Sequence, residues 1–228
     1  MAFLGIIALL AVLALIYGPQ FWVGHTLRKH SAARPDFPGT GGEMAQHLVE
    51  RFALDGVRVE RTDAGDHYDP EARTVRLSAD NYDGASLTAV AVAAHEVGHA
   101  IQHHRGERGL RLRQTLARLA MTTDRIASVF FIAAPVLAIA LRTPAAMLAL
   151  AVIGIGLLGV RVVVHLVTLP VEYDASFNKA LPILREGNYL GEDDLASARS
   201  VLKAAALTYV AAALTSLLNL ARWVRVLR

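Results

Sequence analysis

The sequence of 228 residues contains no cysteine and only 7% aromatic residues. The lack of thiols excludes disulfide bonds, thiolate zinc sites and a cysteine nucleophile. Charged residues make up 19% of the chain, and the formal net charge of +3 is too small to indicate nucleic-acid binding. Hydrophobic residues make up 54%, and since few of them are aromatic the excess is aliphatic, which is typical of chains that lie in lipid.

The chain begins with a long run that contains no charged residue, from Ala2 to Val23. At 1.5 Å per residue, a helix of this length crosses a hydrocarbon core of about 30 Å. A cleaved signal peptide is a poorer interpretation, because no lysine or arginine precedes the run and no small-residue cleavage site stands before Gly18. The run therefore predicts an uncleaved membrane anchor.

Three further uncharged runs lie in the second half of the chain. Residues 126–141 and 143–160 are separated only by Arg142, and together they predict a membrane hairpin. Residues 204–221 form the last run, which is diluted by threonine, serine, tyrosine and asparagine. This last run is expected either to cross the membrane or to form an amphipathic or buried helix, so the sequence predicts three to four transmembrane helices.

Positive residues indicate which side of the membrane each segment faces. Arginines are frequent before the predicted hairpin, whereas its tip holds only Arg142. Because loops rich in lysine and arginine stay in the cytoplasm, residues 28–125 are expected on the cytoplasmic side. If the last run crosses the membrane, the arginines after residue 221 would lie on the outer side, which disagrees with this rule. Those that precede the hairpin are Arg105, Arg108, Arg111, Arg113, Arg118 and Arg125.

A soluble stretch between residues 35 and 102 opens with a helix signal. Thr40 and Glu43 stand three residues apart in the pattern of a capping box, which predicts that a helix begins there. Gly56 is expected to end this helix. Its apolar face is predicted to consist of Met44, Leu48 and Phe52.

Strand signals and a second helix signal follow. Residues 57–60 and 74–77 alternate between apolar and polar side chains, which predicts two short strands that form a β-hairpin. The connection between them contains the turn signal Asp69-Pro70. A long helix is expected from near Ser86 to Ile101.

The long helix carries the motif His-Glu-x-x-His at positions 95 to 99. His95 and His99 are four residues apart and share one helical face, so both imidazoles can reach one Zn²⁺ ion. Glu96 lies beside them, where its carboxylate can take a proton from a metal-activated water. The neighbouring residues are apolar, and buried histidines and carboxylates need a polar partner. The motif therefore predicts one Zn²⁺ per chain.

A catalytic zinc site needs a third protein ligand. No histidine follows His99 at the spacing that places a third imidazole on the same site, so a distant carboxylate is expected. Pro170 suits the first turn of a helix, which would place Glu172 one turn in, with Asp174 two residues further on. Two predicted membrane crossings separate the motif from these carboxylates, so both lie on the same side. Asp69, far upstream, is the third carboxylate to consider.

Four motifs along the chain are similar to those of the YugP-type neutral zinc metallopeptidases, a family of membrane-embedded bacterial proteins. The resemblance covers essentially the whole chain. It implies a zinc-dependent membrane peptidase with His95, His99 and Glu172 as the metal ligands and Glu96 as the catalytic base. The motifs are DHYDP at 66–70, AVAAHEVGHAIQH at 91–103, LPVEYDAS at 169–176 and VLKAAALTYVAAAL at 201–214.

The chain also resembles, more distantly, the HtpX-type membrane peptidases. In those enzymes an aspartate stands four residues after the glutamate ligand, whereas here Ser176 occupies that position. Asp174 and Ser176 are therefore both candidates for orienting the histidine rings. Within the DHYDP motif, His67 and Tyr68 are candidates for donating to the oxyanion of the tetrahedral intermediate.

Taken together, these patterns predict a mainly α-helical, membrane-integrated protein with a zincin-like active-site helix, a short β-hairpin and three to four transmembrane helices. Five segments follow in order: an N-terminal anchor (1–23), a cytoplasmic part that carries the motif (24–125), a transmembrane hairpin (126–169), a third-ligand helix with its connection (170–200), and a C-terminal transmembrane or membrane-associated helix (201–228). The expected location is the cell (inner) membrane, with several crossings and the active site on the cytoplasmic side.

The expected activity is that of an endopeptidase in which a metal-activated water attacks the peptide bond and Glu96 serves as general base. Peptides or proteins, membrane proteins among them, are the expected substrates, and the lipid bilayer is the expected surroundings. An extended peptide is expected to add along the strand at 74–77. A zinc-binding but inactive membrane scaffold is the alternative, although it would have no use for Glu96.

Overall fold

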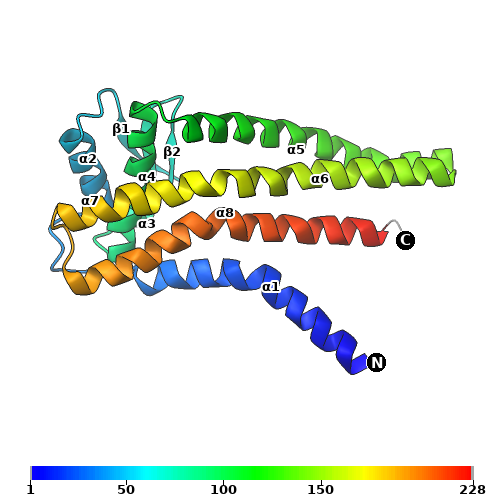
Figure 1. Cartoon of the computed structure of the whole chain (residues 1–228), viewed down its shortest axis with the longest axis horizontal. Coiled ribbons are helices and arrows are strands. Elements are labelled where there is room, and N and C mark those ends of the chain that lie inside the picture. The colour runs from blue at the N-terminus through cyan, green and yellow to red at the C-terminus, as the bar shows by residue number, and fades with distance from the viewer. Residues whose placement is uncertain (1, 227–228) are drawn as a thin grey trace. The chain divides into compact units, whose positions relative to one another are not determined.

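The computed structural model describes the backbone of residues 2–226. The side chains of residues 1–6, 8–12, 15–16, 158, 161, 209 and 212–228 lie outside this description. Helices dominate the chain, and three short strands interrupt them (Figure 1). The elements are α1 (Ala2–Lys29), α2 (Gly41–Arg51), β1 (Arg58–Thr62), β2 (His67–Asp69), β3 (Thr74–Ser78), α3 (Ala79–Tyr82), α4 (Leu87–His104), α5 (Arg108–Leu141), α6 (Pro144–Tyr173), the π-helix η1 (Asp174–Ala180), α7 (Leu181–Glu186) and α8 (Glu192–Val226).

The chain divides into two units. Unit 1 comprises Met1–Gln20, Leu112–Leu169 and Tyr209–Arg228, and unit 2 comprises Phe21–Arg111 and Pro170–Thr208. The four long helices α1, α5, α6 and α8 contribute residues to both units. Unit 2 contains all three strands and the His-Glu-x-x-His motif, so the chemistry predicted from the sequence belongs to this unit.

Two helical runs in the described part of the chain are long and apolar enough to cross a membrane, Arg108–Leu141 and Pro144–Glu186. The second run comprises α6, η1 and α7. Only Arg142 and Thr143 separate the two runs, which agrees with the break predicted there. Many apolar side chains along α5 are exposed, and Ile132 is 78% exposed. That α1 and α8 also cross stays a prediction, because many of their side chains lie outside the described residues.

The three strands form one sheet in the order β1-β3-β2. β1 pairs with β3 in parallel, and β2 pairs with β3 antiparallel. The predicted hairpin between 57–60 and 74–77 was therefore wrong, although both strands are present. The connection contains the additional strand β2, so the chain reverses direction twice before β3 meets β1. Asp69 forms the predicted turn, since its Oδ1 accepts hydrogen bonds from the backbone N–H groups of Glu71 and Ala72.

The central position of β3 affects how a peptide could bind. A strand with neighbours on both sides has its backbone hydrogen-bonding groups in the sheet, so no edge is left for another strand. The expectation that an extended peptide adds along 74–77 was therefore wrong. The edges of this sheet belong to β1 and β2.

Helix α2 begins as the sequence predicted. The Thr40 hydroxyl accepts a hydrogen bond from the backbone N–H of Glu43 at 3.2 Å, and the Glu43 carboxylate accepts one from the Thr40 N–H at 2.7 Å. The helix ends at Arg51, before the predicted terminator Gly56. Ala53 already has a φ of 47°, and this left-handed conformation breaks the helical path three residues earlier.

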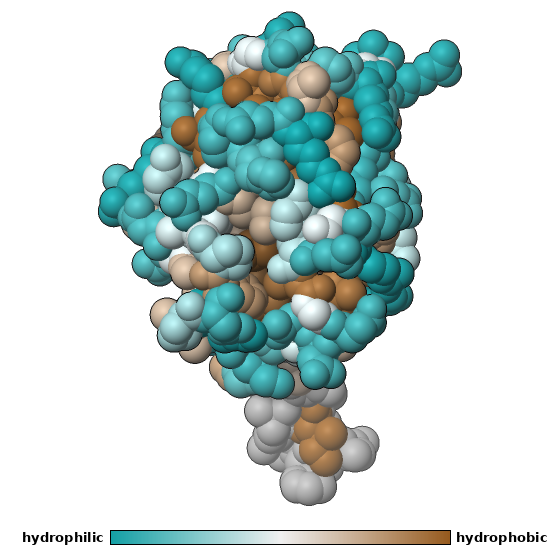
Figure 2. Space-filling model, turned by 90° about the vertical axis from the view of Figure 1, so that its left-hand side faces the viewer, coloured by the Kyte–Doolittle hydropathy of each residue, from teal (hydrophilic) through white to brown (hydrophobic). Residues whose placement is uncertain are grey.

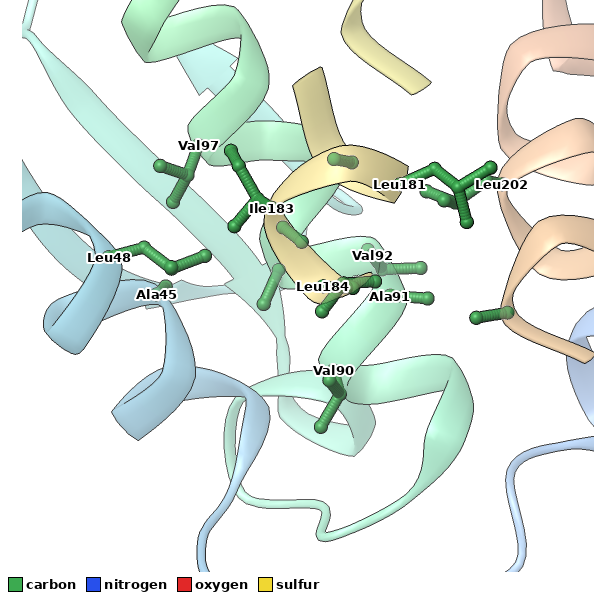
Figure 3. Packing of buried hydrophobic residues seen from close by; sticks show 14 of the residues in the cluster. Ala45, Leu48, Val90, Ala91, Val92, Val97, Leu181, Ile183, Leu184 and Leu202 are labelled. Carbon is green, nitrogen blue, oxygen red and sulfur yellow. The ribbon is translucent and has the colours of Figure 1, made fainter. Parts of the chain in front are cut away.

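The core of unit 2 surrounds helix α4. Every residue from Leu87 to Gln102 is buried. Figure 3 shows apolar side chains from α2, α4, α7 and α8 around this helix, among them Leu48, Leu184 and Leu202. These contacts hold α4 on several sides.

Hydrophilic residues cover most of the face at the α2 and α7 end of unit 2, with hydrophobic residues visible between them (Figure 2).

Pro170 does not begin a helix. It lies inside α6, which continues to Tyr173 and then passes into η1. The predicted helix start at this position was wrong, because α6 continues through Pro170, which removes one backbone N–H donor without ending the helix. In η1 the hydrogen bonds span five residues, as in the bond from the Leu181 N–H to the Ser176 carbonyl.

Candidate metal centre

Helix α4 presents His95, Glu96 and His99 inside unit 2. Ser86 caps the helix, since its hydroxyl accepts a hydrogen bond from the backbone N–H of Ala89 at 3.1 Å. The exposed fractions of the three side chains are 4%, 7% and 1% in the order of the sequence. The two imidazole rings lie edge to face, with their centroids 4.8 Å apart. The helical spacing thus brings both rings to one place.

Glu172 completes a group of three side chains. It lies in the last turn of α6 and is 1% exposed. Its Oε2 lies 3.4 Å from His95 Nε2 and 3.2 Å from His99 Nε2. Candidate ligand atoms of the three residues all lie within 4.8 Å of one another. Of the three carboxylates considered from the sequence, Glu172 is therefore the one that the structure brings to the histidines.

The donor atoms of this group fit a divalent metal ion. Two imidazole nitrogens and one carboxylate oxygen are the donor set of many catalytic zinc sites. A buried carboxylate such as that of Glu172 also needs a compensating positive charge nearby. The site can therefore hold one metal ion through three protein ligands and leave a coordination position for a substrate or water.

The two candidates for orienting the histidine rings occupy different places. Ser176 Oγ lies 3.0 Å from His95 Nδ1 and is completely buried. Asp174 lies further away from the rings: its Oδ2 accepts a hydrogen bond from Gln102 Nε2 at 2.7 Å, and the Gln102 Oε1 lies 2.8 Å from His99 Nδ1. Asp174 thus reaches the site through Gln102.

The candidates for oxyanion donation, His67 and Tyr68, both lie on β2. The Tyr68 hydroxyl is 2.8 Å from His103 Nδ1, and His67 Nδ1 is 2.8 Å from the Gly65 carbonyl. Burial raises the pKa of Tyr68 to about 12 and lowers the pKa of His103. At neutral pH a protonated tyrosine therefore contacts a neutral histidine. The role of His67 and Tyr68 at an oxyanion stays a prediction.

Sequence reasoning missed three polar residues near the site, namely Gln102, Lys179 and Glu107. Gln102 is 1% exposed and Lys179 is 7% exposed. Lys179 forms ion pairs with Asp174 and with Glu107, the latter at 3.1 Å. One signal for Gln102 was present in the sequence, because it stands three residues after His99 on the same helical face.

Gly98 allows α4 to approach η1 closely. A Cβ atom at this position would lie 2.9 Å from the carbonyl oxygen of Ala175, which is a backbone atom that cannot move aside alone. We expect Gly98→Ala to lower the free energy of unfolding by about 1–3 kcal/mol, because the two helices must separate. Thermal unfolding of the purified protein measures this loss.

Gly156 provides a matched control for this substitution. It also lies inside a helix, but a Cβ atom there would meet nothing within 4 Å. Gly156→Ala is expected to keep or slightly raise the unfolding temperature, because alanine favours the helix. Equal unfolding temperatures for the two variants would contradict the close approach at Gly98.

The sequence is similar to those of a zinc metallopeptidase family, in agreement with the geometry of the site. A family model described as "Putative neutral zinc metallopeptidase" matches residues 5–228. The chain is 37% identical over 221 residues to the "Putative membrane protease YugP" of Bacillus subtilis (strain 168), which covers 95% of this chain and 93% of that protein. No solved structure gives a significant match.

Proposed function

The chain belongs to this family of neutral zinc metallopeptidases, and on that premise we propose that it is a membrane-bound zinc endopeptidase. The observation that carries the proposal is the convergence of His95, His99 and Glu172 in one buried group of candidate ligands. Peptides and proteins are the proposed substrates, membrane proteins among them.

The proposed mechanism assigns separate roles to the ligands and the base. His95, His99 and Glu172 would hold the ion, which when bound polarises the scissile carbonyl and lowers the pKa of water. Glu96 follows His95 directly on α4, so the helix that carries two ligands also fixes the base next to them. Glu96 accepts a proton from the attacking water and returns it to the leaving amine.

Metal analysis tests the ligand assignment. We expect about one zinc ion per chain in the purified protein, because three protein ligands form a complete catalytic set. A double variant, His95→Ala with His99→Ala, should lose the ion. His104→Ala is the matched control, since His104 is an exposed residue at the end of the same helix and should leave the zinc content unchanged. Full occupancy in the double variant would overturn the assignment.

We also propose that the protein crosses the cell (inner) membrane several times, with the metal centre on the cytoplasmic side. Two candidate spans and the name of the Bacillus relative support a membrane location. Crossings by α1 and α8 and the sidedness are proposals that rest on uncharged runs and on the arginines of residues 105–125.

Reporter fusions test the sidedness. A reporter inserted after Ala64, in the exposed connection between β1 and β2, is expected to give a cytoplasmic signal. A reporter at Arg142, between α5 and α6, is expected to give an external signal, because positively charged loops stay in the cytoplasm and this tip carries a single arginine. The same signal from both positions would show that α5 does not cross.

A further inference from the structure

A chain of polar side chains leads away from His99 inside unit 2. Gln102 contacts His99 Nδ1, Asp174 contacts Gln102, and Lys179 contacts both Asp174 and Glu107. A lysine that is 7% exposed and a glutamine that is 1% exposed are expensive to bury unless they are paired. This series of contacts ends at the imidazole of His99 and determines its protonation pattern.

The hydrogen bonds of Gln102 have only one consistent direction. Its Nε2 donates to Asp174 Oδ2 at 2.7 Å and to the Val171 carbonyl oxygen at 3.1 Å, and neither a carboxylate nor a carbonyl can donate in return. The amide is thereby fixed with Oε1 toward His99, 2.8 Å from Nδ1. An amide oxygen only accepts, so Nδ1 of His99 must carry the proton.

The direction of these hydrogen bonds determines which ring nitrogen of His99 can bind a metal ion. A neutral imidazole that is protonated on Nδ1 keeps its lone pair on Nε2. That Nε2 atom is the one that lies 3.2 Å from Glu172 Oε2, in the group of candidate ligands. Gln102 therefore selects the tautomer in which His99 can act as a ligand.

Asp174 is in turn held as an acceptor. The ammonium group of Lys179 can only donate, and it forms an ion pair with Asp174 Oδ2. Asn178 Nδ2 lies 2.9 Å from the other oxygen, Asp174 Oδ1. Glu107 Oε1 also pairs with the Lys179 ammonium, at 3.1 Å. The charge of Asp174 is thus balanced by a lysine, and a neutral amide separates it from the imidazole.

His95 reaches the same state by a shorter route. The Ser176 hydroxyl donates to the Leu202 carbonyl oxygen at 3.1 Å, which leaves its lone pairs to accept from His95 Nδ1 at 3.0 Å. Nδ1 of each histidine thus donates to a neutral oxygen, that of Ser176 or Gln102. The hydroxyl or amide hydrogens of these two residues are in turn donated to backbone carbonyls and to a carboxylate.

We propose that Gln102 is a positioning residue of the metal centre, which selects the tautomer and ring orientation of His99 and is itself held by the Asp174, Lys179 and Glu107 ion pairs. This inference rests on the proposed function. Partners that orient histidine ligands contribute about 10–100-fold to metal affinity or activity. Removal of Gln102 should therefore weaken zinc binding by about 10–100-fold without removing any ligand.

The first test is Gln102→Ala in the full chain, with zinc affinity measured by chelator competition and the visible absorption of the Co²⁺-substituted protein as a second readout. We expect weaker zinc binding and shifted cobalt bands, because the ring of His99 loses its fixed orientation. Gln46→Ala is the matched control: it removes an exposed glutamine whose Nε2 donates to Glu50 on α2, and it should change neither readout.

A charge-exchanged pair tests the direction of the hydrogen bonds. Gln102→Glu alone places a second carboxylate beside Asp174 and should weaken zinc binding, since like charges repel. Combined with Asp174→Asn, the new carboxylate can accept from His99 Nδ1 and from the new amide. The double variant should therefore bind zinc more tightly than Gln102→Glu, a rescue that loss of folding would not produce.

The outcomes distinguish this inference from the proposed function. Zinc affinity and cobalt bands in Gln102→Ala equal to those of the wild type would overturn the positioning role while the metal site stands. If Gln102→Ala does not fold, the absence of rescue in the double variant overturns it. A wild-type protein that binds no zinc would overturn the proposed function, and this inference with it.

Discussion

Replacement of Glu96 with glutamine is expected to leave the zinc content unchanged and to lower the rate of peptide hydrolysis by about 10²–10⁴-fold, the usual contribution of a general acid–base group. The amide has nearly the same shape as the carboxylate but cannot accept the proton of the attacking water. The ligands His95, His99 and Glu172 are untouched, so binding and catalysis separate. Metal analysis and kcat on a fluorogenic peptide library measure the two effects.

The matched control is Glu50→Gln on α2, which changes an exposed glutamate far along the chain from the motif and should retain full activity. Cleavage by Glu96→Gln at the wild-type rate would remove Glu96 from the mechanism. A zinc-loaded wild type that cleaves no peptide in the library would instead favour an inactive scaffold. The same pair of measurements thus decides between the two functions.

Removal of the third ligand should have a comparably large effect. Glu172→Ala takes away one of three converging donor atoms. Loss of a residue that only orients a ligand lowers metal affinity by up to about 100-fold, so we expect loss of a ligand to lower zinc affinity by more than that. Peptidase activity should disappear with the ion. Asp174→Asn keeps nearly the same side-chain shape, and this residue contacts the histidines through Gln102, so the variant should retain much of the metal.

Zinc titration of the two variants under the same conditions ranks the carboxylates. The reverse ranking, in which Asp174→Asn loses the ion and Glu172→Ala keeps it, would move the ligand two residues along the chain. Because both residues lie near the junction of α6 and η1, disturbance of that junction alone would affect the two variants alike. A clear difference between them therefore reports on coordination.

Local signals in the sequence predicted the elements that depend on neighbours along the chain. The capping box of Thr40 and Glu43 and the cap at Ser86 place helix starts correctly, because capping involves residues within one turn. The histidine pair of the motif falls on one face for the same reason. These features require no knowledge of distant contacts.

The sheet could not be predicted in the same way. Strand pairing joins residues that are far apart in sequence, and three residues such as His67–Asp69 carry too little periodicity to indicate a strand. Because β2 lies between the two predicted strands along the chain and pairs at the edge of the sheet, β1 and β3 run parallel rather than antiparallel. The strands were present in the pattern, but their partners depended on tertiary structure.

At the metal centre, the residues that can bind a metal ion directly were easier to predict than the residues that hold those ligands in position. Glu172 stood out as a carboxylate after the predicted hairpin, and family resemblance favoured it. Gln102 is neutral and lies at the end of an apolar helix, where a buried glutamine has many structural explanations. Its function depends on Asp174 and Lys179, 72 and 77 positions away, which no local pattern connects to it.

The π-helix that follows Glu172 makes the length of this segment as important as its composition. Seven residues, Asp174–Ala180, follow five-residue hydrogen bonding, which accommodates one more residue than the α-helical path would. If the same residues followed the α-helical path instead, the additional residue would turn every following side chain by about 100° relative to α6. Lys179, five residues after Asp174, could then no longer face it. The hydrogen-bonding pattern of this segment, and not only its composition, therefore brings the lysine to the aspartate.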